Sequence, residues 1–153
     1  MTIHEAIEQE IGNLTTATRY EYADLEEANA TIFDKITSGS FPVCLVFPFD
    51  ISDNREDGLV SSAEINALFL TRANQPTIDK PQSEIESELV APMRALSREF
   101  INRLDENEII DGDGISSVVH RSAHQPVGDA HLYGCWSVFT VNFTEDLGRC
   151  LPH

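Results

Sequence analysis

The chain has 153 residues, of which 41% are hydrophobic, and it carries 26 acidic against 10 basic side chains for a formal net charge of -16. This length suits a single domain with its own core, and no apolar run is long enough to span a bilayer. Because so negative a chain repels nucleic-acid backbones and anionic membranes, we expect neither simple DNA or RNA binding nor a membrane partner. The acidic, amphipathic opening "MTIHEAIEQE" predicts no export leader.

The first part of the chain predicts two helices separated by a short strand. Thr2 followed by Glu5 is a capping box, and isoleucines at helical spacing continue an apolar face to residue 14. Alternating Thr and Tyr residues predict a strand over 16–22. A second amphipathic pattern predicts a helix over 24–36. We therefore expect the fold to begin α-β-α.

The middle of the chain predicts a long β-hairpin. The stretch "FPVCLVFPF" (41–49) is apolar on both faces and typical of a central, buried strand. Residues 62–72 alternate in hydrophobicity, and we expect them to form its antiparallel partner. The polar residues 50–61 and 73–82 are expected to be exposed loops, one inside the hairpin and one after it.

The clearest predicted element is a helix over 83–106. An apolar residue recurs there every three or four positions, and acidic residues precede arginines, the order that the helix dipole favours. Pro92 lies inside this helix, where it removes a backbone hydrogen bond and crowds a carbonyl. We therefore expect a kink of the helix axis near Glu88–Leu89.

Two further strands, over 114–123 and 130–143, close the predicted fold. The element order is then α-β-α-β-β-α-β-β, which predicts an α+β fold with helices packed on one face of an antiparallel sheet. Because no linker composition interrupts this series, we expect one domain over 1–146 and a short C-terminal tail over 147–153.

The "DGDG" motif and the cysteines are candidates for ligand sites. "DGDG" (111–114) begins a calcium loop only if an oxygen ligand follows at the fifth position and Glu at the twelfth, but Ile115 and Ser122 occupy these places. We expect a tight turn between helix and strand there. The three cysteines are widely spaced, unlike a disulfide framework or a zinc site, and Cys44 and Cys135 lie in apolar runs where we expect them to be buried.

The stretch "HRSAHQPVGDAH" (120–131) holds three of the five histidines. A meeting of His120, His124 and His131 across two strands would create a zinc site. Pro126 and the glycine near it instead indicate a connection between the last two strands, where three nitrogens rarely converge with tetrahedral geometry. We therefore expect no metal ion and no other cofactor, and we interpret the stretch as a polar contact loop.

Three stretches of the chain form a series: "RYEYADLEEANATIFDKI" (19–36), "FPVCLVFPFD" (41–50) and "GDAHLYGCWSVFTVNF" (128–143). In this order they resemble the tail-terminator and tail-completion proteins found at the head–tail neck of tailed bacteriophages. Members of that family have an N-terminal helix, an aromatic strand, a central strand entered by Phe-Pro, a charged hairpin, a long helix and a final apolar strand pair. The resemblance is one of element order and covers nearly the whole chain.

The resemblance implies a structural virion protein and not an enzyme. Terminators of this type form a homo-oligomeric ring, usually a hexamer, that ends the tail tube and joins it to neck or portal proteins after assembly in the host cytoplasm. An acidic lumen would let DNA pass without sequence-specific binding. Contacts between subunits or rings are expected at the polar loops, through Asp50, Asp53, Asn54, Arg55, Glu56, Asp57, Asn74, Asp79, Lys80, His124, Gln125 and Asp129.

Two other functions fit parts of the sequence. A small metal- or carboxylate-dependent hydrolase would use the histidines and carboxylates of 111–131, although no nucleophile motif, phosphate loop or HExxH accompanies them. An acidic adaptor that mimics DNA would account for the net charge but not for the apolar strands at 41–49 and 132–143. The ring protein is the hypothesis that accounts for both the charge and the strands.

Overall fold

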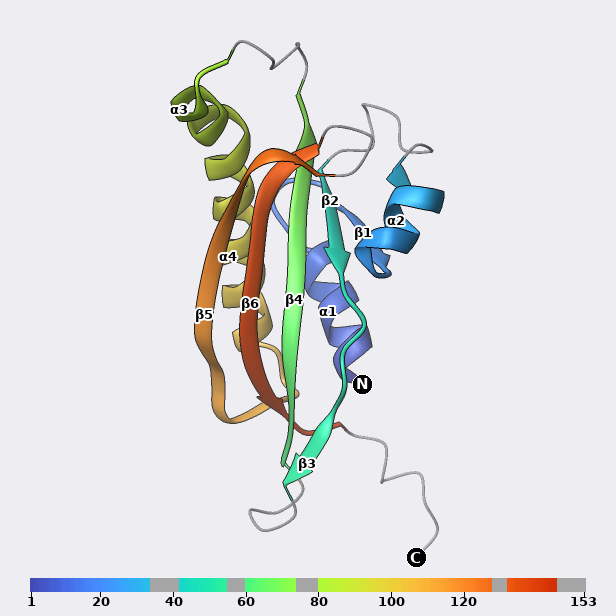
Figure 1. Cartoon of the computed structure of the whole chain (residues 1–153). Helices are drawn as coiled ribbons and strands as arrows, with labels where there is room; N and C mark the ends of the chain where they lie inside the picture. The colour runs from blue at the N-terminus through green and yellow to red at the C-terminus, as the bar shows by residue number, and fades with distance from the viewer. Residues whose placement is uncertain (34–41, 55–59, 74–79, 128–131, 146–153) are drawn as a thin grey trace, which may run out of the picture.

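The computed structural model of the protein describes residues 1–33, 42–54, 60–73, 80–127 and 132–145 (Figure 1). Its elements are α1 (Ile3–Gly12), β1 (Arg19–Tyr22), α2 (Leu25–Thr31), β2 (Val43–Val46), β3 (Ser52–Asn54), β4 (Val60–Arg72), α3 (Gln82–Ile85), a π-helical turn (Glu86–Val90), α4 (Ala91–Asp105), β5 (Ile110–Val127) and β6 (Leu132–Phe143). The predicted order of helices and strands is confirmed, with β3 as an addition inside the predicted loop 50–61. The predicted tail, 147–153, lies outside the described residues.

The strands form one mixed sheet in the order β1-β2-β4-β6-β5, and β3 pairs separately with β4. The predicted antiparallel pairing of β2 with β4 is confirmed. β1 and β2 run parallel, however, so the prediction of an antiparallel sheet is wrong at this edge. The reason is that α2 lies between these two strands in the sequence. A chain that leaves a strand, passes through a helix and returns to the neighbouring position makes a crossover that joins parallel strands.

Helices cover both faces of the sheet, so the prediction of helices on one face is also wrong. α1 and α4 lie on one face (Figure 1), and their apolar side chains belong to the same core as those of β4 and β6. Ala28 of α2 and Phe33 just after it pack on the opposite face, against apolar side chains of β2 and β4. The cause is that β2 is buried at all four of its positions, which requires cover on both faces.

The N-terminal helix is held at its start by the predicted capping box. The Thr2 hydroxyl accepts a hydrogen bond from the Glu5 N–H at 3.1 Å, and the Glu5 carboxylate accepts one from the Thr2 N–H at 3.4 Å. The Glu145 carboxylate, just after β6, accepts a further bond from the Ile3 N–H at 3.0 Å. A distant carboxylate therefore satisfies one more of the free N–H groups at this helix end.

A π-helical turn lies where the sequence predicts a kink of the helix axis before Pro92. α3 continues directly into this turn and then into α4, which has the proline in its first turn. Because Pro92 has no N–H, the carbonyl four residues before it cannot complete an α-helical bond. The chain bonds over five residues instead, from the Ala91 N–H to the Glu86 carbonyl. The predicted position, Glu88–Leu89, lies inside this turn.

Strand β5 is longer and less regular than the sequence predicts. "DGDG" lies within it as a bulge, at a shift of register against β6, and is not a turn before the strand. There the Asp105 carboxylate accepts a hydrogen bond from the Ile115 N–H at 3.2 Å. Gly114 has a φ of 66°, and a Cβ on it would lie 2.7 Å from that carboxylate oxygen. At the other end β5 takes in residues 120–127, so the predicted contact loop is mostly strand.

The central strands β4 and β6 come so close at Gly134 that no side chain fits between them. A Cβ on this residue would lie 1.8 Å from the Phe69 carbonyl oxygen and 3.1 Å from the Leu70 Cα. Gly134 is opposite Leu70 in the ladder. The β5–β6 pair is thus joined to the rest of the sheet at a position where only glycine fits.

Candidate functional site

The predicted contact residues whose positions the structure describes include groups at two different ends of the sheet. Asp50 precedes β3 and Asp53 and Asn54 belong to it, at one end (Figure 1). Lys80 lies next to α3 at the other end, where its ammonium pairs with the Glu88 carboxylate. Arg55, Glu56, Asp57, Asn74, Asp79 and Asp129 lie outside the described residues, and of His124 and Gln125 only the backbone, in β5, is described.

Among the histidines of the predicted cluster, His120 has a described side chain, and it belongs to a hydrogen-bond network. Its Nδ1 lies 2.6 Å from the Ser137 Oγ of β6, which in turn lies 2.6 Å from the Ser97 Oγ of α4. His131 lies outside the described residues. Within the described part of the chain, no group of three or more metal-ligating side chains occurs. The network therefore links β5, β6 and α4 through two hydroxyls and one imidazole.

This network has the atoms of a nucleophile and a base but not their accessibility. Ser97 and Ser137 are both 0% exposed, and the Ser137 oxygen contacts both of its partners. Burial, followed by the nearby Arg98 and Arg94 guanidinium groups, lowers the pKa of His120. The Nδ1 of a neutral His120 can accept a hydrogen bond from the Ser137 hydroxyl and so satisfy this buried group. The arrangement suits a polar link within the core, because no substrate atom can reach the serine oxygen.

A sulfur atom lies beside the same network. Cys135 Sγ is 3.6 Å from the Ser137 Oγ and 3.9 Å from the His120 Nδ1. Burial raises the pKa of the Cys135 thiol, so the sulfur stays protonated and is a weak nucleophile. Cys44 is also buried, as the sequence predicts, and neither cysteine is in a disulfide.

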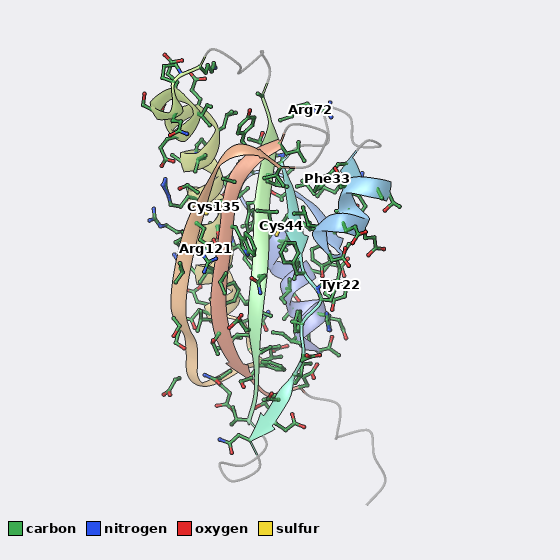
Figure 2. The ribbon with its side chains drawn as sticks, in the orientation of Figure 1. Tyr22, Phe33, Cys44, Arg72, Arg121 and Cys135 are labelled. Atoms are coloured by element: carbon green, nitrogen blue, oxygen red, sulfur yellow. The ribbon has the colours of Figure 1, made fainter. Side chains whose placement is uncertain are left out.

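Exposed large hydrophobic side chains of the described residues lie near both edges of the sheet. Val118 and Val119 of β5 are 40% and 49% exposed. Near the other edge, Tyr22 at the end of β1 is 42% exposed, Leu25 at the start of α2 is 37% exposed and Ile51 before β3 is 39% exposed. β1 and β5 are the two ends of the strand order, and Figure 2 shows Tyr22 far from Arg121 of β5.

Tyr22 is supported by two other rings. His4 of α1 stacks on Phe49, with ring centroids 4.7 Å apart. Tyr22 meets both edge-on, at 5.1 Å from His4 and 6.1 Å from Phe49. The three rings come from α1, β1 and the segment after β2, so the exposed tyrosine is held in place by separate elements of the fold. A ring fixed in this way loses little conformational freedom when a partner covers it.

The part of the sheet near β5 that faces away from α4 presents a tryptophan and an arginine. Trp136 donates its Nε1–H to the Asn66 Oδ1 at 3.0 Å and meets the Phe47 ring edge-on at 5.6 Å. The Arg121 guanidinium lies 5.8 Å from the centroid of the Trp136 ring. Val119 lies two residues before this arginine on the same strand. Trp and Arg are the side chains that most often dominate protein contacts.

These edge residues were not among the predicted contacts. One signal was available, because "SSVVHR" (116–121) places two adjacent apolar side chains in an otherwise polar strand. Adjacent residues of a strand point to opposite faces, so one of them has to leave the core unless the strand bulges. The pairing of Arg121 with Trp136 depends on the register of β5 with β6, which no local pattern reveals.

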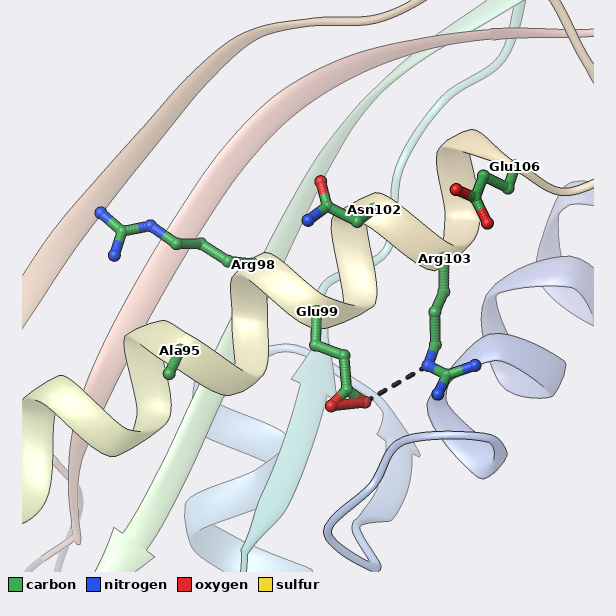
Figure 3. Close-up of a pocket in the computed structure, with 6 residues that line it drawn as sticks. All are labelled: Ala95, Arg98, Glu99, Asn102, Arg103 and Glu106. Atoms are coloured by element: carbon green, nitrogen blue, oxygen red, sulfur yellow. Dashed lines mark hydrogen bonds and ion pairs between the residues drawn. The ribbon is translucent and has the colours of Figure 1, made fainter.

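A shallow depression on the outer side of α4 is a less promising site. It is lined by Ala95, Arg98, Glu99, Asn102, Arg103 and Glu106 (Figure 3). Its central carboxylate is already engaged: Glu99 accepts a bond from the Thr15 N–H at 2.8 Å and one from the Arg103 Nε–H at 3.3 Å. The Thr15 bond, with help from Arg103, lowers the pKa of Glu99. These contacts fasten the segment after α1 to α4.

Fold and surface together define an α+β protein with a mixed six-stranded sheet and exposed apolar groups on opposite sides of it. No family model matches the chain, and no curated protein matches it. None of the described helices is both long and apolar enough to cross a membrane.

Proposed function

We propose that this chain is a structural virion protein of a tailed bacteriophage, which forms a homo-oligomeric ring that ends the tail tube and joins it to the neck or portal. The order of its helices and strands is the one expected for tail-terminator and tail-completion proteins. Its net charge of -16 suits a ring through which DNA passes, because an acidic lumen does not hold the phosphate backbone.

The observation that carries the proposal is the pair of exposed apolar groups at opposite edges of the sheet. One group is Val118 and Val119, and the other includes Tyr22 and Leu25. Two different contact groups on opposite sides let each copy meet two neighbours at once. Repetition of one such contact closes into a ring when the rotation between neighbours divides a full turn.

The polar residues at the ends of the sheet fit the same proposal. If subunits meet side to side, the two ends of each sheet remain available to whatever lies above and below the ring. Asp53 and Asn54 lie at one such end and Lys80 lies at the other. In this arrangement the predicted contact residues would meet the tail tube on one side and the neck on the other.

The test is the mass and shape of the purified protein. We expect light scattering coupled to size exclusion to give a mass of several chains, and negative-stain images to show closed rings that bind the ends of tail tubes. A protein that stays monomeric at its highest soluble concentration and does not bind tubes would contradict the proposal. Competition with DNA for a basic protein by such a monomer would indicate the acidic adaptor instead.

A further inference from the structure

Two arginines near the middle of β5 have no ion pair with any described residue. Arg121 is exposed on β5 itself, over the Trp136 ring. Arg98 is exposed on α4, near enough to His120 to help lower its pKa. In a chain with 26 acidic and 10 basic residues, a guanidinium without a carboxylate is available to another molecule. Ion pairs within the chain engage Arg19, Lys80, Arg94 and Arg103.

Arg121 lies on the same strand as the exposed valines, and Arg98 of α4 lies near His120 of that strand. Val119 is opposite Val138 in the ladder, and Arg121 is opposite Trp136. A bulge precedes Val119, where the register with β6 shifts and Ser117 has a φ of 56°. We call this set, Arg98, Val118, Val119 and Arg121, the β5 contact surface. It combines an apolar centre with positive charge.

The opposite edge of the sheet, near β1 and α2, also has exposed apolar side chains, and negative charge accompanies them. Tyr22 and Leu25 are exposed, and Glu26 and Glu27 of α2 are exposed beside them. We call these four residues the α2 contact surface. The neighbouring Asp24 is excluded, because its carboxylate caps α2 by accepting the Glu27 N–H at 2.7 Å. Residues 1–33 contain one basic residue, Arg19, and the acidic residues Glu5, Glu8, Glu10, Glu21, Asp24, Glu26 and Glu27.

We infer that the β5 contact surface of one copy binds the α2 contact surface of a second copy. In this contact the valines meet Tyr22 and Leu25, and the two arginines meet Glu26 and Glu27. The inference rests on the proposed ring, since it names a second copy as the partner. It adds the direction of assembly and the residues that set it.

Charge decides between this contact and its alternatives. Two β5 contact surfaces facing each other would place arginines against arginines, and two α2 contact surfaces would place carboxylates against carboxylates. The unlike pairing matches the charges, and it is the head-to-tail contact that a ring requires. Copies with a net charge of -16 repel each other, so cations placed at the contact allow close approach.

Charge reversal in the full chain tests the inference. In each of the double variants Arg98→Glu/Arg121→Glu and Glu26→Lys/Glu27→Lys, the β5 and α2 contact surfaces carry charges of the same sign. We expect each to need at least roughly a hundredfold higher protein concentration to assemble, by light scattering, than the unmodified chain. The variant with all four changes restores unlike charges, so we expect it to assemble again. Circular dichroism checks that each variant is folded.

The matched control for Glu26→Lys/Glu27→Lys is Glu106→Lys/Glu108→Lys, which makes the same change of net charge at exposed positions after α4. We expect this control to assemble as the unmodified chain does. If both double variants form rings as readily as the unmodified chain, the assignment of the contact is wrong, although the proposed ring is not contradicted. Failure of the four-fold variant to assemble, although folded, would also overturn the assignment of the contact. A monomeric unmodified chain would instead overturn the proposed function itself.

Discussion

The two edges of the sheet expose apolar side chains in different settings. β1 has 4 residues, and its exposed Tyr22 is supported by the His4 and Phe49 rings among many carboxylates. β5 has 18 residues, and it is fastened to α4 through the network of His120, Ser137 and Ser97. Positive charge lies beside β5 and negative charge beside β1. A sheet with unlike edges can join copies of itself in one direction.

The irregularity of β5 adds to this difference. Three shifts of register separate its paired segments from one another. Bulges of this kind interrupt the row of free N–H and C=O groups through which an edge strand adds a further strand. We therefore expect β5 to meet its partner through side chains and not by extending the sheet.

The largest expected effect is the loss of stability on the β5 side when Gly134 gains a side chain. Because a Cβ there would meet the Phe69 carbonyl, Gly134→Ala should lower the free energy of unfolding by roughly 3 kcal/mol or more in urea denaturation. Amide exchange should rise first in β5 and β6. Gly12→Ala is the control, since a Cβ at that position meets no atom within 4 Å. Equal effects of the two variants would contradict the close approach.

Removal of the Ser137 hydroxyl should weaken the link between β5 and α4. Ser137→Ala leaves the His120 Nδ1 and the Ser97 hydroxyl without their partner, and we expect a loss of about 1–3 kcal/mol in the free energy of unfolding. Ser122→Ala, at an exposed position of β5, should change it by less than about 0.5 kcal/mol. If the two variants are equally stable in urea, the network does not stabilise this edge.

The β1 side can be weakened at its ring cluster. Tyr22→Ala removes the edge-on contacts with His4 and Phe49, and we expect it to lower the free energy of unfolding by about 1 kcal/mol. Tyr22→Phe keeps the ring and should leave stability nearly unchanged. Val119→Ala on the β5 side should cost less than Tyr22→Ala, because the smaller valine side chain, which is 49% exposed, buries less apolar area than the tyrosine. The reverse order, measured on non-assembled protein, would contradict the different support of the two edges.

The smallest effect concerns pH. The pKa of His120 is lowered from 6.5 in the folded chain, by burial and by Arg98 and Arg94, so the unfolded chain binds the proton more readily. The free energy of unfolding should therefore fall as the pH drops from about 6.5 through the lowered pKa of His120. Above about pH 6.5 the contribution of His120 should be constant. His120→Asn should show a smaller fall in urea denaturation between pH 7.5 and pH 5.5. An equal fall in both proteins would exclude a contribution from His120.

Local patterns predicted the elements well. The capping box at Thr2 and the order of helices and strands follow from side chains within one or two turns of each other. Pro92 indicated the position of the π-helical turn, although the form predicted there was a kink. "DGDG" was misassigned because the group that stabilises it, Asp105, belongs to the preceding helix and bonds the Ile115 N–H. The parallel pairing of β1 was missed because strand direction depends on which neighbour the chain returns to after α2.

The surfaces were harder to predict than the elements. Of the predicted contact residues with described positions, those of β3 and Lys80 lie at opposite ends of the sheet. The network beneath β5 joins residues 97, 120 and 137, which no short motif connects. Ordinary serines acquire a defined role there because α4 and β6 place their hydroxyls 2.6 Å apart.

The sequence by itself determined that this is an acidic α+β chain with apolar strands, because composition and hydrophobic period are local properties of the chain. The tertiary structure alone decided that the sheet is mixed, that α2 covers the second face and that β1 and β5 become its edges. It also decided that Arg121 lies over the Trp136 ring and that Arg98 of α4 lies near His120 of β5. Strand order and register depend on contacts between residues far apart in the sequence. They are therefore set by the free energy of the whole fold and not by any local pattern.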